Sequence, residues 1–388
     1  MTRKENRMLL VIKLITFLAC LTWWWVALAW SAGYRRMDDL AEQPLPSLHD
    51  LPSLSIIVPA RNEASVVGQS LAAILGDAPP GTEVILIDDR SKDDTGRIAL
   101  AVARSDSRLK VITVEQLPDG WLGKNHALQK GAEESKGEWI LFTDADVHFE
   151  PGCLPRALDY ARKNDVDHLI AAPRMATKGF WEKVFVSFFI VSLLTWLRAW
   201  RVNNEKGKGF IGIGAFNMVR RQAYERAGQH EALKDEVIDD LVLGRNLRMT
   251  GSRQRIIGGK GCLWVRWNEG LWGLVRGVEK NAYSGFGYNP LRMIAGCLAL
   301  TAGTVVPAVA LFTGDARAVI PGTGVFIAFA ICYRLAGRNS DIPWTYFVTF
   351  PVGASLQVLA IVRSAFLYHV RGGVRWRGTL YKKVGKGL

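Results

Sequence analysis

The chain has 388 residues with a formal net charge of +13, and 49% of its residues are hydrophobic. This length allows one domain of ordinary to large size with additional segments. The five cysteines form no Cys-x-x-Cys pair, and three of them lie in apolar segments, which disfavours both a disulfide framework and a zinc site.

An apolar segment covers residues 8–30 and is interrupted only by Lys13. It is long enough to cross a bilayer core, which takes about 20 residues. A cleaved signal peptide is the rival interpretation, but the segment exceeds the length of an h-region, and the three tryptophans at 23–25 suit an anchor at the membrane interface. We therefore expect an uncleaved N-terminal membrane anchor over residues 1–33.

A linker and a series of strand-like and helix-like segments follow the anchor. Residues 34–52 contain Pro44, Pro46 and several acids, which is typical of a linker. We expect strands at residues 54–60, 83–89, 110–114 and 139–143, and helices at residues 65–75, 93–105 and 125–135. This alternation predicts an α/β domain, over residues 53–285, with a mostly parallel sheet. The first strand is not followed by Gly-x-Gly-x-x-Gly, so NAD and FAD are disfavoured.

The predicted strand at 139–143 ends in two acids, Asp144 and Asp146. Because residues two apart in an extended segment point the same way, both carboxylates face one crevice at the carboxyl end of the sheet. Two adjacent carboxylates repel unless a cation lies between them, which favours Mg²⁺ or Mn²⁺ held together with diphosphate oxygens. A solvated Asp-x-Asp turn is the alternative, and this short motif alone does not decide between them.

The second half of the domain contains an aromatic segment and an acidic one. Residues 180–202 carry charges at both ends, which predicts a helix in the membrane interface, with a core helix or a further span as alternatives. Residues 207–214 are glycine-rich and predict a flexible loop on the acceptor side. Residues 233–250 predict a helix whose early turns carry Asp239 and Asp240. Acids in the first turns of a helix are often surface residues that match the helix dipole.

A second apolar region covers residues 293–367 and is divided by short polar segments. It predicts two or three membrane helices within residues 290–370. From Arg363 to Leu388 there are seven Lys or Arg and no acid, so we interpret residues 371–388 as a basic tail on the cytoplasmic side, against anionic lipid. Because these basic residues adjoin a membrane segment, we expect no nucleic acid as a partner.

Five motifs occur in order between residues 54 and 281. They are Ile57-Val-Pro-Ala-Arg-Asn-Glu63, Ile87-Asp-Asp-Arg-Ser-Lys-Asp-Asp-Thr95, Trp121-Leu-Gly-Lys-Asn-His-Ala-Leu128, Thr143-Asp-Ala-Asp146 and Asp239-Asp-Leu-Val-Leu-Gly-Arg245. The series resembles the motifs of family 2 glycosyltransferases, which have the Rossmann-like GT-A fold. The flanking membrane segments and the tail Val374-Arg-Trp-Arg-Gly378 are similar to those of bacterial hopene-associated and carotenoid-type glycosyltransferases.

The resemblance implies a nucleotide-diphosphate sugar as the donor. In similar enzymes the pair Asp88 and Asp89 contacts the base and the ribose, and a carboxylate that accepts an imide N–H favours uracil, hence a UDP-sugar. The implied donor-binding residues are Pro59, Arg61, Glu63, Asp88, Asp89, Lys124 and Asp144, and those at the divalent cation are Asp146 and Asp144. A helix-start acid is the alternative for Glu63, and a solvated loop lysine for Lys124.

The resemblance also implies a base. A Glu-Asp pair is usual in the family's last motif, and its Asp accepts the proton of the acceptor hydroxyl. In this chain Asp239 stands where Glu is usual, so Asp240 matches the base and Asp239 an orienting residue. The implied reaction is a direct displacement at the anomeric carbon, with inversion of configuration.

The membrane segments on both sides of the domain favour a membrane lipid as the acceptor of a hexose. We expect a multi-pass protein of the inner (cytoplasmic) membrane with its catalytic domain in the cytoplasm, where nucleotide sugars are found. A membrane polysaccharide synthase and a catalytically inactive membrane adaptor remain alternatives. Polymerising members of the family carry Gln-x-x-Arg-Trp, whereas this chain has only Trp264-Val-Arg-Trp267 and Trp272-Gly-Leu-Val-Arg276, which disfavours processive synthesis.

Overall fold

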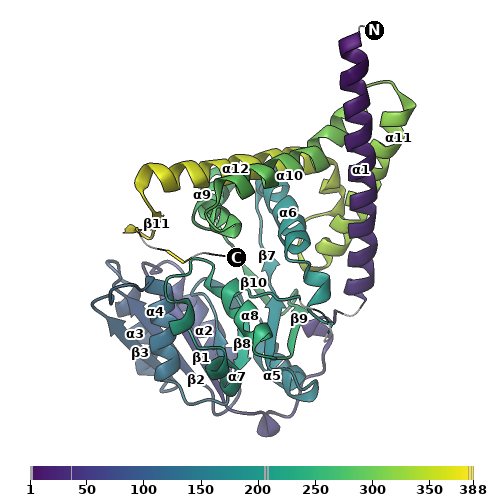
Figure 1. Cartoon of the computed structure of the whole chain (residues 1–388). Helices are drawn as coiled ribbons and strands as arrows, with labels where there is room; N and C mark the ends of the chain where they lie inside the picture. Colours follow the sequence, from purple (N-terminus) through teal and green to yellow (C-terminus); the bar gives the residue numbers. More distant parts are fainter. Residues whose placement is uncertain are drawn as a thin grey trace.

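The computed structural model describes residues 3–35, 37–204, 207, 209–382, 384–385 and 387. An α/β domain forms one end of the molecule, and apolar helices form the other (Figure 1). Four residues of the expected glycine-rich loop and basic tail lie outside the described residues: Lys208, Lys383, Lys386 and Leu388.

A seven-stranded sheet with strand order β3-β2-β1-β4-β8-β6-β9 forms the centre of the α/β domain. Its strands are β1 (Leu54–Ala60), β2 (Glu83–Asp89), β3 (Leu109–Val114), β4 (Trp139–Phe142), β6 (His168–Ala172), β8 (Asn217–Arg220) and β9 (Gln254–Gly258). Neighbouring strands pair in parallel except at β8, which runs antiparallel to β4 and β6. The predicted α/β class with a mostly parallel sheet is confirmed, and β1 and β2 have the predicted bounds.

Helices cover both faces of this sheet. α2 (Val67–Asp77), α3 (Thr95–Ser105) and α5 (Cys153–Lys163) cover one face, and α4 (Gly123–Glu133), α7 (Arg221–Arg226) and α8 (Asp239–Met249) cover the other. The alternation of side chains along β1 serves both cores, because Ile56 and Val58 pack in the first and Ile57 packs in the second.

Helix α8 begins at Asp239 instead of at residue 233. The side-chain amide of Asn125, in α4, donates hydrogen bonds to the carbonyl oxygens of Leu233 at 2.6 Å and of Glu236 at 2.9 Å. The Leu233 carbonyl oxygen also accepts a 3.0 Å hydrogen bond from Glu236 N, which closes a tight turn instead of continuing an α-helix. The segment before Asp239 is consequently a loop, and Asp239 and Asp240 are in the first turn of α8.

A second, three-stranded sheet has the order β5-β10-β7. Its strands are β5 (Val147–Phe149), β7 (Arg174–Met175) and β10 (Leu263–Val265). Since β4 ends at Phe142 and β5 begins at Val147, the pair Asp144 and Asp146 lies in the short connection between strands of the two sheets.

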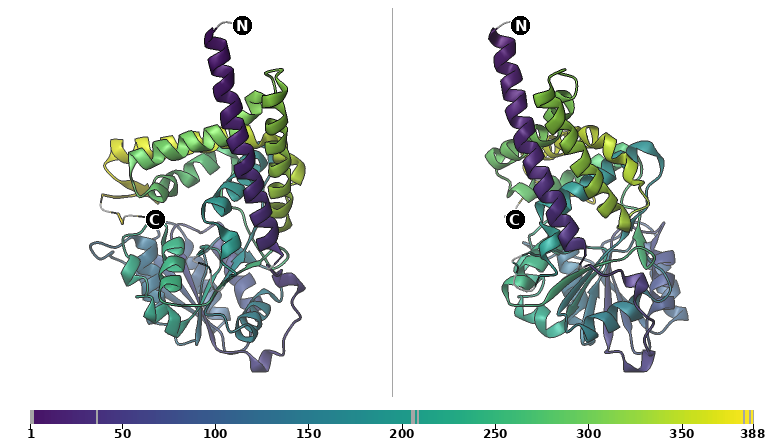
Figure 2. Two further views of the ribbon diagram at one scale, coloured as in Figure 1. Left: turned by 45° about the vertical axis from the view of Figure 1, so that its right-hand side comes forward. Right: turned by 90° about the vertical axis from the view of Figure 1, so that its right-hand side faces the viewer.

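Five helices in the described part of the chain are long and apolar enough to cross a membrane. They are α1 (Arg3–Tyr34), α6 (Gly179–Trp196), α10 (Pro290–Ala310), α11 (Ala316–Ala336) and α12 (Phe350–Arg371), and the shorter α9 (Gly270–Ala282) packs among them. Figures 1 and 2 show that α1 and α11 rise away from the α/β domain, whereas α12 lies across it. Helix α6 packs against α9, α11 and α12, and its expected place in the membrane interface stays a prediction.

Helix α1 is fixed to the C-terminal helices at two levels. The indole nitrogen of Trp23 donates a 2.9 Å hydrogen bond to the carbonyl oxygen of Gly303 in α10. Nearer the start of α1, Lys13 Nζ lies 2.6 Å from Asp315 Oδ2, in the turn between α10 and α11. The N-terminal helix and the C-terminal helices therefore form one helical unit.

The chain after α12 returns to the α/β domain. Gly372 ends α12 in the left-handed conformation, with φ of 66°, and a hairpin of β11 (Val374–Trp376) and β12 (Thr379–Tyr381) follows. We expected the basic tail to lie against lipid, but its hairpin contacts the carboxyl edge of the large sheet. Positive charges alone did not distinguish a lipid surface from a cluster of protein acids.

Candidate active site

Three neighbouring strands bring the predicted donor-binding residues to one edge of the sheet. Strands β2, β1 and β4 are parallel neighbours, so their carboxyl ends meet. The predicted residues at or just beyond these ends are Pro59, Arg61, Glu63, Asp88, Asp89, Asp144 and Asp146. Lys124, Asp239 and Asp240 come to the same place from the first turns of α4 and α8. The structure thus gathers residues from five separate segments at one edge.

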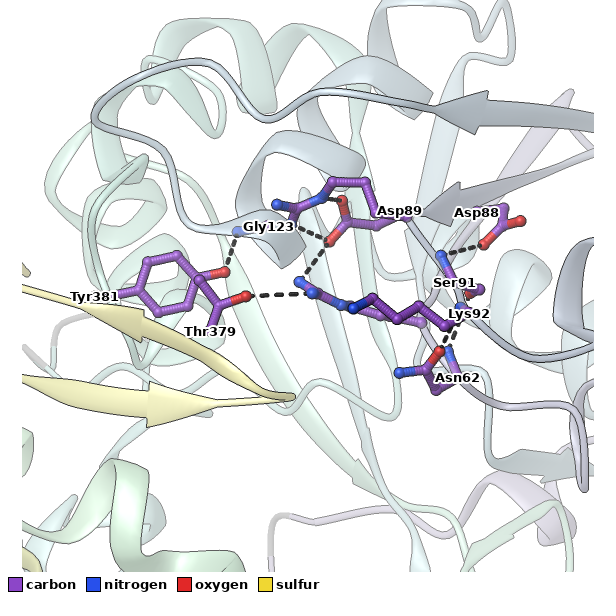
Figure 3. A network of polar contacts seen from close by, with 10 residues as sticks. Asn62, Asp88, Asp89, Ser91, Lys92, Gly123, Thr379 and Tyr381 are labelled. Atoms are coloured by element: carbon purple, nitrogen blue, oxygen red, sulfur yellow. Dashed lines mark hydrogen bonds and ion pairs between the residues drawn. The ribbon is translucent and has the colours of Figure 1, made fainter.

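Asp89 is held between two arginines at the end of β2 (Figure 3). Its carboxylate accepts hydrogen bonds from Arg90 Nε at 2.7 Å and Nη2 at 2.9 Å, and Arg61 Nη1 lies 3.7 Å from its Oδ2. The neighbouring Asp88 accepts a 3.3 Å hydrogen bond from the backbone nitrogen of Ser91. Both carboxylates are buried, so their orientation is fixed by protein contacts.

Lys124 joins the acids of the donor side to those of α8. Its Nζ lies 2.8 Å from Asp144 Oδ1 and 3.5 Å from Asp239 Oδ2. Burial alone would lower the pKa of Lys124, but the surrounding carboxylates raise it above its ordinary value. Lys124 is therefore a permanent cation at the centre of the site, and its interpretation as a solvated loop lysine is wrong.

The pKa values of the two acids after β4 are shifted in opposite directions. Burial raises the pKa of Asp144, but the Lys124 ammonium outweighs burial and holds it below its usual value. Burial and the charge of Asp144 together raise the pKa of Asp146 to about 6. The protein therefore compensates the negative charge of Asp146 poorly. A cation bound beside such a carboxylate is strongly favoured.

This pair fits a divalent cation that takes most of its ligands from elsewhere. No cluster of three or more His, Cys, Asp or Glu side chains within the described ranges has the geometry to hold a metal ion. Asp144 and Asp146 would supply carboxylate oxygens, and donor and water oxygens would have to complete the coordination. A cation at this pair would therefore depend on ligands from outside the protein.

Asp240 is oriented by two backbone N–H groups. Its Oδ2 accepts a 2.9 Å hydrogen bond from Gly214 N, and its Oδ1 accepts a 2.8 Å hydrogen bond from Leu241 N. Burial, followed by the neighbouring charge of Asp239, raises the pKa of Asp240 to about 6. A fixed carboxylate with a raised pKa has the properties of a general base near neutral pH.

The glycine-rich loop lies directly on the first turns of α8. A Cβ atom on Gly212 would come within 1.8 Å of the backbone oxygen of Asp240, and one on Gly244 within 2.1 Å of the backbone oxygen of Ile211. Only glycine permits this approach, because a methyl group at either position overlaps backbone atoms. The close packing brings Gly214 N to the Asp240 carboxylate.

Lys280 and Arg377 lie near the site and were not predicted from the sequence. Lys280, near the end of α9, is buried, and burial, followed by the charge of Lys124, lowers its pKa. Its Nζ lies 4.8 Å from the ring centroid of Trp376 in β11. No local sequence pattern indicates that Lys280 reaches the site. The alternation of residues on both sides of Arg377-Gly378, by contrast, is typical of a β-hairpin, which we had not predicted.

A cavity of about 540 Å³ opens from the acids into the apolar helices. Its charged lining residues are Lys124, Asp144, Asp146, Asp239, Asp240 and Lys280. Most of its wall is apolar, with aromatic side chains from three segments: Trp30, Phe185, Phe189, Trp196, Trp200 and Trp267 among them. The cavity thus connects a cluster of carboxylates with a space suited to a long apolar molecule.

Comparison with known proteins identifies similar sequences and a similar fold. Residues 55–228 match the model of the family described as Glycosyl transferase family 2. The 4,4'-diaponeurosporenoate glycosyltransferase of Staphylococcus aureus strain bovine RF122 / ET3-1 is 24% identical over 369 residues, covering 92% of this chain and 96% of the relative. The same enzyme of strain MRSA252 is 24% identical over 358 residues, covering 90% and 92%.

One solved structure is similar over nearly the whole chain. It is the mannosyltransferase PcManGT from Pyrobaculum calidifontis in complex with GDP-Man and Mn²⁺, with a TM-score of 0.54 and 20% sequence identity. The match covers 92% of this chain and 98% of the other. At this identity the likeness establishes a common fold, including the helices outside the α/β domain.

Proposed function

Because this chain is a family 2 glycosyltransferase, we propose that it transfers a hexose from a nucleotide-diphosphate sugar to the hydroxyl group of a membrane lipid. The cavity carries this proposal, since it leads from Asp240 and Lys124 into a space lined by apolar helices. A soluble acceptor needs no apolar cavity lining. A lipid acceptor needs one, because its apolar chain has to lie in the cavity when its hydroxyl reaches the carboxylates.

The donor occupies the edge formed by β1, β2 and β4. Asp88 and Asp89 bind the base and ribose, and uracil is favoured because a fixed carboxylate accepts its imide N–H. The diphosphate lies beside Asp144 and Asp146. A divalent cation bound there would neutralise the charge that develops on the departing nucleoside diphosphate.

Asp240 performs the proton transfer in this proposal. Its carboxylate accepts the proton of the acceptor hydroxyl while that oxygen attacks the anomeric carbon, and the bond from this carbon to the diphosphate oxygen breaks. A single displacement inverts the configuration. Asp239 and Asp144 hold Lys124 near the reacting groups, where its charge stabilises the leaving diphosphate.

The test uses membranes that contain the full chain, supplied with radiolabelled UDP-glucose and, in parallel, other nucleotide sugars. After extraction with organic solvent, we expect label in the lipid phase in the presence of Mg²⁺ or Mn²⁺. Label found only in a high-molecular-weight, water-soluble product would overturn the lipid acceptor and support the polysaccharide synthase. No incorporation from any donor would support the inactive adaptor.

A further inference from the structure

The C-terminal hairpin covers the donor edge of the sheet. Its two strands are joined by a two-residue turn, Arg377-Gly378, because Trp376 pairs with Thr379. Both turn residues have positive φ, 45° for Arg377 and 82° for Gly378, as a type I′ turn requires. The tight turn presents the guanidinium of Arg377 at the tip of the hairpin.

The hairpin contacts donor-edge residues from two separate segments (Figure 3). Arg61 Nη2 donates a 3.2 Å hydrogen bond to Thr379 Oγ1, and Gly123 N, at the start of α4, donates a 3.3 Å hydrogen bond to the hydroxyl oxygen of Tyr381. Tyr381 is 8% exposed, so its ring fills space beside the donor edge. A donor cannot reach Asp88 and Asp89 along this side without displacing the hairpin.

Arg377 itself lies beside the acids that surround the diphosphate position. Its Nη2 pairs with Glu63 Oε1. Its charge also acts on Asp144 and Asp146, both of which lie near enough to respond to it. Two further cations lie nearby, Lys124 between Asp144 and Asp239 and Lys280 near the ring of Trp376, so Arg377 would act together with Lys124.

The hairpin has a flexible connection at one end and an anchored chain at the other. Consecutive glycines, Gly372 and Gly373, separate it from α12. On the other side, the backbone nitrogen of Gly385 donates a 2.7 Å hydrogen bond to the carbonyl oxygen of Asp235, and that of Gly387 donates a 3.0 Å hydrogen bond to Glu236 Oε2. Among the described residues, the hairpin's polar contacts with the donor edge include the hydrogen bonds of Thr379 and Tyr381 and the ion pair of Arg377, and a bound donor or water could replace each of them.

From this geometry we propose that the hairpin Val374–Tyr381 is a mobile wall of the donor site, and that Arg377 exchanges its contact with Glu63 for the diphosphate of the bound donor. The proposal rests on the proposed use of a nucleotide-diphosphate sugar. A planar guanidinium suits this role, because its fork of N–H groups binds two phosphate oxygens at once.

The test measures the binding of UDP and UDP-glucose, with Mn²⁺ present, to the purified full chain in detergent by calorimetry. Loss of a charge-assisted contact predicts that Arg377→Ala weakens binding by about 10- to 100-fold. Arg377→Lys restores part of this loss, since it keeps the charge but not the fork. Arg375→Ala is the matched control, because this exposed arginine of the same hairpin makes no ion pair with any described residue.

A double variant separates direct contact from simple charge balance. If Arg377 acts only by neutralising Glu63, Arg377→Ala causes no further loss of affinity in a Glu63→Gln background, and the proposal is overturned. Direct contact predicts that the double variant binds the donor more weakly than Glu63→Gln alone, by about the same factor that separates Arg377→Ala from the wild-type chain. Equal thermal stability of the Arg377 and Arg375 variants shows that the hairpin substitution has not unfolded the domain.

The same titrations separate this inference from the proposed function. If the wild-type chain binds none of UDP-glucose, GDP-mannose and their nucleoside diphosphates, the proposed donor class is wrong. If it binds one of them and Arg377→Ala binds it equally well, the donor class stands and the role of Arg377 is wrong. If Arg377 binds the donor, steady-state assays of Arg377→Ala will show a donor KM that rises by a much larger factor than kcat falls.

Discussion

Asp240 and Asp146 are acids of similar burial for which we propose different tasks. Asp240 faces the cavity with both oxygens held by backbone N–H groups, whereas Asp146 shares the donor edge with Asp144. Single substitutions therefore separate proton transfer from donor binding.

The first prediction concerns the base. Asp240→Asn keeps the size of the side chain but removes proton acceptance, so turnover falls by about 10² to 10⁴ while donor affinity is retained. The measurement is kcat for sugar transfer together with a donor titration. Asp235→Asn, in the loop just before α8, is the control and retains activity. Normal turnover of Asp240→Asn would show that another residue is the base.

The second prediction concerns the cation. Because Asp144 and Asp146 offer too few ligands to hold an ion without the donor, chelation with EDTA abolishes transfer, and added Mn²⁺ or Mg²⁺ restores it. Asp146→Ala also abolishes transfer in this assay, and added Mn²⁺ or Mg²⁺ does not restore it. Full activity of the wild-type chain in excess chelator would contradict the metal site.

The third prediction concerns pH. Asp240 accepts a proton only as a carboxylate, and burial with the charge of Asp239 raises its pKa to about 6, so kcat/KM for sugar transfer rises as the pH increases through about 6. The pKa of Asp146 is also about 6. Protonation of Asp146 at lower pH would weaken cation binding and so would lower the rate as well. Asp239→Asn removes one raising charge and moves the midpoint to lower pH. A rate that increases as the pH falls from 7 to 5 is incompatible with this assignment.

Some residues of the candidate site lie in local sequence motifs, whereas others reach it only through the packing of distant elements. Asp88, Asp144 and Asp240 lie in short motifs next to strands or helices, and the resemblance to the family selected them; their roles stay predictions. Lys280 and Arg377 join the site from α9 and from the C-terminal hairpin. Their proximity depends on how the helices pack over the sheet, and no local pattern contains that information.

At the scale of elements, the joint between the glycine-rich loop and α8 controls the position of the proposed base. Gly212 contacts the backbone of Asp240, and Gly244 contacts that of Ile211. The strand and helix alternation predicted most of the sheet. The start of α8 could not be predicted, because side-chain bonds from Asn125 hold the preceding loop.

The fourth prediction tests this joint. Gly212→Ala overpacks the contact by one methyl group, which costs about 1–3 kcal/mol of stability or shifts Asp240 from its place. We expect a large loss of kcat with a smaller change in donor affinity. Gly76→Ala is the control, since a Cβ there meets no atom within 4 Å. Equal activity of the two variants would show that the close approach has no catalytic consequence.

At the scale of the whole molecule, the helices have two directions, with α1 and α11 upright and α12 across the α/β domain (Figures 1 and 2). Lys13 contacts Asp315 21 residues before the end of α1 at Tyr34. At 1.5 Å per residue this is about 32 Å, close to the thickness of a bilayer core. A bilayer crossed by α1 would therefore have the turn that carries Asp315 at its face opposite the α/β domain.

The fifth prediction follows for topology. We predict two true crossings within residues 290–370, one of them by the upright α11, and one further segment that is interfacial or re-entrant. In a cysteine-free background, a membrane-impermeant maleimide added to intact cells should label Phe312→Cys but not Leu380→Cys. Labelling of Leu380→Cys from outside would refute a cytoplasmic hairpin and, with it, a cytoplasmic α/β domain.

The bonds that hold the last residues of the chain also bear on how the protein is handled in the laboratory. Gly385 and Gly387 are tied to the loop before α8, whereas α1 begins at Arg3, far from the α/β domain (Figure 1). We expect an affinity tag fused to the C-terminus, next to the proposed mobile wall, to weaken donor binding. The same tag at the N-terminus leaves the tail native, so a comparison of the two fusions needs no substitution at all.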